Sequence, residues 1–256
     1  RAGREIAFAT PRIVKENQLE FFRKLFMLWE NLQPDYVYIS NLSLMQLAEE
    51  FPRLRVWADG SLNIFNSAAV AFWRERGVGG VTLSQELTLQ QIRKITEGTN
   101  LPAECHVQGR TEMMVSEYCV GGSFVALLQG VRRKAQGAGN VPCFDNSILD
   151  GLHEGNCQFQ CREKLFLRDR QEAEFPVVGD QYCRMHVLNS VELSLAANIH
   201  EVLEAGVTSL RMDGRYYSVE ELRNLIKMYR DILDGKKSLE ENLPHTTRGH
   251  YFRGVE

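Results

Sequence analysis

The sequence predicts an α/β fold of the TIM-barrel type, a (β/α) barrel that this chain supplies incompletely and that carries a cysteine-rich loop and hairpin insertion. Three observations predict it. β-rich runs alternate with longer helical patterns at intervals of about 25 to 30 residues, as in parallel strands joined by helical crossovers. All six cysteines lie between Cys105 and Cys183, and most of them fall where that alternation stops. The alternation then resumes and brings the strand candidates to seven, one fewer than a closed barrel contains.

Four pairs of a strand and a helix are expected in the first hundred residues. The predicted pairs are 6–10 with 18–32, 36–40 with 42–51, 54–58 with 68–76, and 80–83 with 87–97. In the first of these helices Leu19, Phe22, Phe26 and Trp29 recur at helical spacing, which predicts one buried face. A fifth strand is expected at 103–107.

Residues 109–182 interrupt this pattern, because they contain many glycines and little clear helix, and five of the six cysteines fall between Cys119 and Cys183. One hairpin is predicted there, with strand 164–168 facing strand 174–178 across a turn at 169–173. A loop-rich segment of this length is uncommon in a compact domain unless something ties it down. The interruption therefore predicts an insertion that a metal centre could hold together.

The last part of the chain returns to strands and helices. We expect a strand at 185–188, a helix at 192–204 that ends near Gly206, a strand at 209–212 and a helix at 218–233. Ser218 and Glu221 form a capping box at the start of that last helix. The expected organisation is one structural domain in three segments: the first βα units at 1–108, the cysteine-rich, cluster-binding insertion at 109–184, and the closing units with a tail at 185–256.

Composition and charge narrow the class of protein. The 256 residues are 44% hydrophobic and 25% charged, which is ordinary for a soluble globular protein. The formal charge of −3 provides no general attraction to nucleic acid or anionic lipid, so any contact with RNA must come from a local cluster. The candidate cluster is Arg132, Arg133 and Lys134, although a solvated surface is the favoured interpretation of these three residues.

No apolar run is long enough to cross a membrane and no signal peptide is recognised, so we expect a cytoplasmic protein without a membrane partner. Because the chain begins at Arg1, it is expected to be a segment of a longer protein.

Four cysteines have spacings that fit one metal centre. Cys157 and Cys161 form a close pair, Cys119 lies 38 residues before that pair, and Cys183 lies 22 residues after it. Four thiolates fit a tetrahedral zinc or a 4Fe-4S cluster. Structural zinc sites usually use two close pairs, so the spacing favours iron–sulfur but leaves zinc and free buried thiols open.

The charges and cysteines around these positions refine the interpretation. Arg162, Lys164 and Arg184 lie beside the candidate ligands and could offset the negative charge of a thiolate-bound centre. Cys105 alternates with apolar neighbours on a predicted strand, which indicates a core residue, and Cys143 lies in a loop. We therefore expect neither of these two to be a ligand.

Polar residues at the predicted carboxyl ends of the strands are candidates for binding a substrate, because barrel chemistry occurs at that end. They are Arg12, Asn41, Asn63, Asn66, Glu86, Gln108, Asn189 and Arg211. Each could instead be a cap or turn residue, as Asn41 would be if it capped the following helix. Arg12 and Arg211 are the best anchors for a carboxylate or a phosphate.

Five motifs follow one another between residues 109 and 254. They are GRTEMMVSEYC at 109–119, GNCQFQC at 155–161, LRDRQEAEFPVVGDQYCRMHVLNS at 167–190, LRMDGR at 210–215 and TRGHYFRG at 247–254. Shorter motifs precede them: PRI at 11–13, SNL at 40–42, LNIFNS at 62–67 and LSQEL at 83–87. In this order they closely resemble the peptidase U32 family, and the resemblance covers essentially the whole chain.

The resemblance implies a TIM-barrel scaffold and a cofactor. The family is named for collagenase-like proteolysis, yet several members look like iron–sulfur proteins that support oxygen-independent hydroxylation of tRNA, ribosomal RNA or a quinone precursor. Carried over by motif, Cys119, Cys157, Cys161 and Cys183 are implied to ligate a 4Fe-4S cluster. Many relatives carry a further cysteine where this chain has Glu112, so the four ligands here must include Cys183. Relatives also usually show a strand and a helix before the PRI motif, so a partner chain or a missing segment is expected to complete the barrel.

Two hypotheses about function follow. The first is an iron–sulfur enzyme that hydroxylates an RNA base or a small aromatic precursor. The alternative is a U32-type, collagenase-like peptidase or a peptide-binding module with a structural metal, which could be zinc. The chain contains neither GxSxG nor HExxH, and His106 and His186 lie on strand-like segments where core histidines are commoner than catalytic bases. Proteolysis is therefore the weaker hypothesis.

Overall fold

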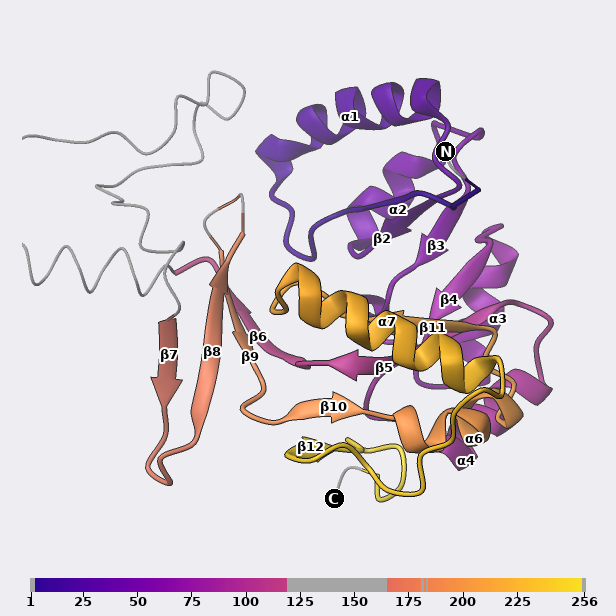
Figure 1. The fold of residues 1–256 in the computed structure, drawn as a ribbon. Helices are drawn as coiled ribbons and strands as arrows, with labels where there is room; N and C mark the ends of the chain where they lie inside the picture. Colours follow the sequence, from indigo (N-terminus) through magenta and orange to yellow (C-terminus); the bar gives the residue numbers. More distant parts are fainter. Residues whose placement is uncertain (1–2, 119–164, 181, 183, 255–256) are drawn as a thin grey trace, which may run out of the picture. The chain divides into compact units, whose positions relative to one another are not determined.

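A computed structural model of the protein describes residues 3–118, 165–180, 182 and 184–254. The chain divides into two compact units (Figure 1). The first unit comprises Arg1–Gly109 and Leu193–Glu256, and the second comprises Arg110–Glu192. Within the residues described, no helix combines the length and the apolar character that a membrane span requires.

The first unit is a mixed α/β structure built on a parallel sheet. Five strands lie side by side in chain order: β1 (Ala7–Ala9), β2 (Tyr36–Ile39), β3 (Val56–Ala58), β4 (Gly80–Thr82) and β5 (Ala103–Gly109). β11 (Ser209–Met212) runs parallel to β5 along its other edge. β10 (Glu192–Ser194) pairs antiparallel with the end of β5, and β12 (Thr246–Thr247) lies beyond it. The predicted parallel strands at 6–10, 36–40, 54–58, 80–83, 103–107 and 209–212 are confirmed, with shorter or slightly different bounds.

Helices follow most of these strands, as the pattern predicted. They are α1 (Leu19–Leu32), α2 (Leu42–Ala48), α3 (Ser67–Glu75), α4 (Leu89–Glu97), α6 (Ile199–Glu204) and α7 (Val219–Leu233), with 3-10 turns η1 (Glu16–Gln18), η2 (Gly60–Leu62) and η4 (Ala196–Asn198). Phe22, Phe26 and Trp29 are buried on one face of α1, which confirms that prediction. The Ser218 side chain accepts the Glu221 N–H and the Glu221 carboxylate accepts the Ser218 N–H, so the predicted capping box is present.

The sheet of the first unit curves like part of a barrel, but a closed barrel is not shown. The Tyr38 hydroxyl on β2 donates to Glu104 on β5 over 2.9 Å, although β3 and β4 lie between these strands. Neighbouring strands are about 4.8 Å apart, so a flat sheet would separate β2 from β5 by roughly 14 Å. The sheet must therefore be concave on the face that carries these side chains. Among the described residues, β1 and β11 end the run of parallel strands and do not pair with each other.

Residues 185–188 form a strand, but the prediction that it belongs to the barrel is wrong. This strand, β9 (Met185–Leu188), pairs with β6 and β8 in the second unit, while β10 takes the place beside β5. The predicted helix 192–204 accordingly begins as a strand, and helix α6 starts only at Ile199. Helical spacing of buried residues holds from Ala196 onward, whereas Leu193 is buried through pairing with Gly109.

The second unit contains a four-stranded antiparallel sheet in the order β6-β9-β8-β7. Its strands are β6 (Glu112–Ser116), β7 (Leu165–Arg168), β8 (Glu174–Gly179) and β9. The hairpin of β7 and β8 confirms the predicted one, and Asp169 holds its turn by accepting the N–H groups of Gln171 and Ala173. Strand β6 was not predicted. The second unit reaches Glu192 rather than the expected residue 184, because β9 belongs to this sheet.

Candidate functional site

The concave face of the first unit carries a buried polar network centred on Glu104, which is only 4% exposed. Its carboxylate accepts three hydrogen bonds: from Tyr38 on β2 at 2.9 Å, from Thr82 on β4 at 2.9 Å and from Ser209 on β11 at 3.0 Å. Alternation along each strand points these side chains to the same face. Because the sheet is curved, side chains from β2, β4 and β11 reach the carboxylate of Glu104 on β5.

A tryptophan ring forms one wall of this network. The Trp57 indole N–H donates to the Thr82 hydroxyl at 3.1 Å, and the ring stacks on Tyr38 with the centroids 5.5 Å apart. Gly80 leaves room for it, because a Cβ on Gly80 would lie 2.3 Å from the ring. The glycine at the start of β4 is therefore required for the position of a side chain that supports Thr82.

Arg211 supplies the positive charge of the network. Its Nη1 lies 2.5 Å from an Asp59 oxygen and 3.5 Å from a Glu104 oxygen, and Asp59 also accepts the Ser40 hydroxyl at 2.8 Å. Burial alone would raise the pKa of Asp59, but the Arg211 charge and the Ser40 hydrogen bond outweigh it and lower that pKa. The Arg211 side chain remains 31% exposed, so the guanidinium is shared between two carboxylates and the solvent.

His106 lies in register with Arg211 on the neighbouring strand. Burial, and then the Arg211 charge, lower the pKa of His106 to about 4, so the imidazole is neutral at physiological pH. Asp213 and Arg215 follow β11 and form an ion pair at 2.7 Å. A neutral imidazole beside a partly exposed guanidinium can accept a proton or a hydrogen bond while the arginine holds an anionic group.

Gln108 is buried near the end of β5, and both the nitrogen and the oxygen of its side-chain amide are hydrogen-bonded. Its Nε2 donates to the Tyr217 hydroxyl at 3.1 Å, and its Oε1 accepts the Tyr229 hydroxyl at 2.9 Å. The Tyr229 hydroxyl also lies 2.8 Å from the Val107 carbonyl. Gln108 therefore joins β5 to α7 in this structure.

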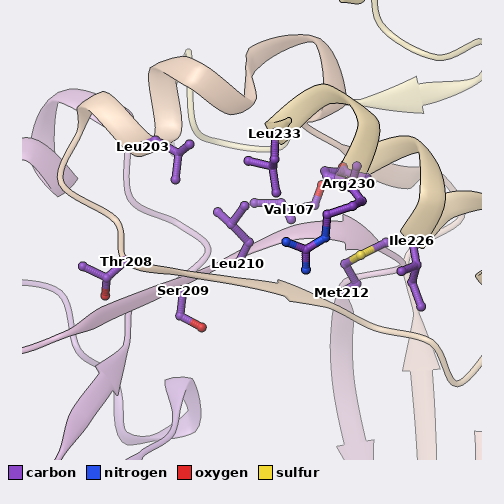
Figure 2. A pocket seen from close by; sticks show the side chains of 10 residues that line it. Val107, Leu203, Thr208, Ser209, Leu210, Met212, Ile226, Arg230 and Leu233 are labelled. Carbon is purple, nitrogen blue, oxygen red and sulfur yellow. Dashed lines mark hydrogen bonds between the residues drawn. The ribbon is translucent and has the colours of Figure 1, made fainter. Parts of the chain in front are cut away.

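A separate pocket of about 390 Å³ lies between β11 and helices α6 and α7 (Figure 2). Its lining residues are Val107, Leu203, Thr208, Ser209, Leu210, Met212, Ile226, Tyr229, Arg230 and Leu233. The lining is mainly apolar, and Arg230 reaches from α7 toward β11. None of the predicted substrate-binding residues lines it, and Ser209 is the one member that also belongs to the polar network.

The second unit has its own charged cluster, centred on His186 in β9. Its Nδ1 lies 2.6 Å from Glu112 on β6 and its Nε2 lies 3.2 Å from Asp180. Hydrogen bonds to Asp180 and to Glu112 raise the pKa of His186 to about 9, so the imidazolium form dominates at neutral pH. The other Asp180 oxygen accepts the backbone N–H groups of Tyr182 and Arg184 at 2.9 Å and 2.8 Å. The imidazolium of His186 thus joins Asp180, at the end of the hairpin that β8 forms with β9, to Glu112 on β6.

Arg184 is the most unusual side chain of that hairpin. It is only 3% exposed, its Nη2 lies 3.5 Å from Glu117, and its guanidinium carbon lies 4.9 Å from the centre of the Tyr182 ring. Its Nε and Nη1 make no hydrogen bond to any part of the chain that the structure describes. A buried charge with free donors calls for an anionic acceptor, and the residue directly before it is Cys183.

The predicted metal ligands Cys119, Cys157, Cys161 and Cys183 lie outside the described residues, as do Cys143 and the basic cluster at 132–134. Within the described part of the chain, no three His, Cys, Asp or Glu side chains are grouped to hold a metal ion. Cys105 is fully buried as predicted, and burial raises the pKa of its thiol to about 12.

The other predicted substrate-binding residues are spread over loops and helix ends. Asn41 and Asn66 accept backbone N–H groups as the N-caps of α2 and α3. Arg12, Asn63 and Glu86 are exposed, and the Arg12 carbonyl accepts the Asn41 side-chain amide at 3.1 Å. Asn189 lies in the second unit, where its N–H donates to the Thr111 carbonyl. Of the eight candidates, only Arg211 lies in the charged network.

Sequence reasoning missed most members of that network, including Tyr38, Asp59, Thr82, Glu104 and Ser209. One signal was present: Glu104 and His106 alternate with apolar residues in the strand AECHV. An acidic side chain on a predicted core strand is expensive to bury, so it indicates partners on the same face.

Comparison with known proteins agrees with the resemblance seen in the motifs. An uncharacterized protease of Methanocaldococcus jannaschii is 27% identical over 99% of this chain and 60% of its own length. The 23S rRNA 5-hydroxycytidine C2501 synthase of Escherichia coli is 23% identical over 98% of this chain and 34% of its own, and the tRNA hydroxylation protein P of the same organism is 24% identical over 86% and 54%. The chain thus spans between about a third and three fifths of these relatives.

A solved structure, that of the U32 peptidase Mk0906, has a TM-score of 0.37 and 14% identity over 60% of this chain and 63% of its own. The sequence profile described as Peptidase family U32 matches residues 1–249. Because that match runs through both units and nearly the whole length, the chain belongs to Peptidase family U32.

Proposed function

We propose that this chain is an iron–sulfur protein that supports oxygen-independent hydroxylation of an RNA base or of a small aromatic precursor. The observation that carries the proposal is that two relatives matching at least 86% of the chain are named for hydroxylation of ribosomal RNA or tRNA. Members of one family can act on different substrates, so experiment must decide between RNA and a small aromatic.

The residues fit a thiolate-bound cluster. Cys119, Cys157, Cys161 and Cys183 would hold a 4Fe-4S cluster, and four thiolates give it a negative charge. The buried guanidinium of Arg184, with its free Nε and Nη1 donors, supports an anionic group beside Cys183. When bound, the cluster supplies one-electron transfer.

The first unit would bind and orient the substrate. Arg211 is the candidate for a carboxylate or phosphate, because its side chain carries a positive charge and is 31% exposed. His106 is the candidate proton acceptor, because it is neutral at physiological pH and lies in register with Arg211. Asp59 and Glu104 would fix the orientation of the guanidinium.

A collagenase-like peptidase, or a peptide-binding module with a structural zinc, is the second candidate. The name of the M. jannaschii relative favours it. A peptidase needs a nucleophile with its base or a metal-bound water. A colourless protein that contains zinc and cleaves denatured collagen would support this alternative over the first proposal.

Iron and acid-labile sulfide analysis of anaerobically purified protein tests the proposal. We expect about four irons per chain, a brown colour that is sensitive to oxygen, and loss of both when Cys157 and Cys161 are changed together to Ala. Cys105→Ala is the matched control, because this thiol is buried in the first unit and is not a predicted ligand. Stoichiometric zinc without iron in the wild type would contradict the proposal.

The reaction itself is tested by mass spectrometry of RNA. Nucleosides from cells that lack the gene, grown without oxygen, should lose a modification that carries one additional oxygen. The wild-type gene should restore it, and the Cys157→Ala, Cys161→Ala variant should not. Unchanged RNA together with a missing hydroxylated aromatic metabolite would assign the small-molecule substrate instead.

A further inference from the structure

The pocket beside β11 has the size and the lining of a small-molecule site (Figure 2). Its volume of about 390 Å³ is within the range of clefts that bind small ligands, and six of its ten lining residues are apolar. Two of these six, Leu203 and Ile226, are 37% and 51% exposed, so apolar surface at the pocket is open to solvent. None of the ten lining residues is acidic. The lining therefore favours a ligand with an apolar body and does not repel an anion.

Three of the four polar residues in the lining are hydrogen-bonded to β5. The Thr208 hydroxyl accepts the Ala103 N–H at 3.1 Å. The Ser209 hydroxyl donates to Glu104 at 3.0 Å, and the Tyr229 hydroxyl donates to a carbonyl of the same strand at 2.8 Å. These three side chains hold β11 and α7 against β5, so the fourth polar residue is the one that a ligand can use.

That fourth residue is Arg230 on α7. Its side chain is exposed, and its guanidinium makes no hydrogen bond or ion pair with the part of the chain that the structure describes. The pKa of Asp234 is lowered by a hydrogen bond to Lys236 at 2.7 Å and, to a smaller extent, by the Arg230 charge, so this carboxylate already has a partner. Figure 2 shows the Arg230 side chain extending from α7 toward β11 over the apolar lining. Its charge is therefore directed at the pocket.

The open edge of β11 adds a second kind of donor. Among the described strands, β11 pairs with β5 alone. The free edge of a strand presents backbone N–H groups that have no partner in the sheet. A carboxylate has two oxygens, so one can accept from the guanidinium while the other accepts from this backbone.

We infer that this pocket binds a small carboxylic acid with an apolar body, whose carboxylate lies on Arg230 and whose hydrocarbon part lies against Leu210 and Ile226. A guanidinium recognises a carboxylate by charge and by parallel N–H donors, which a neutral head group cannot match. The inference goes beyond the proposed function, because the pocket contains no candidate cluster ligand and shares only Ser209 with the polar network.

The test measures the affinity of the full chain, purified anaerobically, for three probes by ligand-observed NMR titration. Octanoate carries the charge and the apolar chain, octan-1-ol carries the same chain without the charge, and acetate carries the charge without the chain. We expect octanoate to bind more tightly than acetate, because only octanoate places methylene groups against the apolar lining.

Arg230→Gln should weaken octanoate binding about fivefold and leave octan-1-ol binding unchanged, since it removes an exposed charge and keeps the apolar lining. Arg223→Gln is the matched control, because it removes the same charge from α7 at an exposed position outside the lining. It should leave both affinities unchanged. Ile226→Glu places a carboxylate in the lining at a side chain that is 51% exposed, and it should weaken both probes, octanoate more than octan-1-ol. Circular dichroism checks that each variant is folded.

Several results would overturn the inference. Equal losses of octanoate and octan-1-ol affinity in Arg230→Gln would exclude the guanidinium as the carboxylate site. Octanoate binding that survives both Arg230→Gln and Ile226→Glu would place the acid elsewhere on the protein. Absence of octanoate binding would also overturn it, and binding of a blocked Val-Thr-Val-Thr peptide instead would assign the edge of β11 to a strand-like partner. Protein that lacks iron but binds octanoate as expected would overturn the proposed function and leave this inference standing.

Discussion

At the scale of single residues, the first unit is defined by one guanidinium between two carboxylates. Arg211 faces Asp59 and Glu104, and Glu104 is too deeply buried to be solvated if the cation is lost. A buried pair is weak support for stability as such, but removing one partner leaves an uncompensated charge. The consequence is that the cation matters more to the fold than an exposed arginine would.

Arg211→Met should lower the free energy of unfolding by about 2 kcal/mol, since it leaves two facing carboxylates unpaired in a partly exposed site. Arg215→Met is the matched control, because Arg215 pairs with Asp213 on the same segment but is 49% exposed, and it should cost at most about 1 kcal/mol. Urea unfolding followed by circular dichroism measures both. Equal losses in the two variants would show that the network does not depend on Arg211.

The polar network could not be predicted from the sequence because it is a property of curvature. The carboxylate of Glu104 meets side chains from β2, β4 and β11, which lie 66, 22 and 105 residues from Glu104 in the chain. Strand alternation predicts which face each side chain occupies. It does not tell how sharply the sheet bends, and only the bend brings Tyr38 and Arg211 to the same carboxylate, that of Glu104.

At the scale of elements, caps explain two of the predicted substrate-binding residues. Asn41 and Asn66 begin α2 and α3 by accepting the N–H groups of Ser43 and Ala69. Asparagine at such a position is expected for helix geometry alone. A role in binding then needs a measurement that separates it from the cap.

Asn66→Ala should cost about 1 kcal/mol of stability through loss of the cap, whereas Asn66→Ser should cost only a few tenths because serine caps equally well. Substrate affinity should be the same in both variants as in the wild type. Thermal unfolding and a binding titration measure the two properties separately. If the serine variant kept its stability but lost substrate affinity, Asn66 would be a binding residue.

The βα units could be predicted because hydrophobic periodicity and length agree for α1, α3, α4 and α7, and a capping side chain begins each of the last three. The errors concentrate between Glu112 and Glu204. There β9 has the apolar pattern of a barrel strand, yet pairs with β6 and β8, and a sequence pattern does not specify the partner of a strand. The four candidate cysteine ligands lie outside the described residues, so their grouping stays a prediction.

At the scale of the whole molecule, two histidines carry opposite pKa shifts in different units. The pKa of His106 is lowered to about 4 by burial, and the pKa of His186 is raised to about 9 by Asp180 and Glu112. A lowered histidine pKa means that the unfolded chain binds the proton more tightly, so stability falls as pH drops from about 6.5 to 4. A raised one gives stability that is complete below about pH 6.5 and is lost as pH rises through 9.

We therefore expect the first unit to weaken in acid by up to about 3 kcal/mol, and the second to weaken in alkali by about 1 kcal/mol after allowance for solvent screening. Amide hydrogen exchange, resolved by peptide and corrected for intrinsic rates, measures each unit separately. His106→Gln and His186→Gln should each remove the pH dependence of its own unit only. A single transition shared by both units at every pH would contradict this expectation.

The pairing of Leu193 with Gly109 has a consequence for how this protein can be modified. The chain leaves the first unit and returns to it at two residues that face each other across one antiparallel ladder, with Cα atoms about 5 Å apart. The ends of the excursion are thus already in the geometry of a tight hairpin. Replacing residues 110–192 with a short glycine-containing turn would shorten a loop and lower its closure entropy cost. We therefore expect that the cysteine-rich segment 110–192 can be exchanged while the first unit keeps its own sheet.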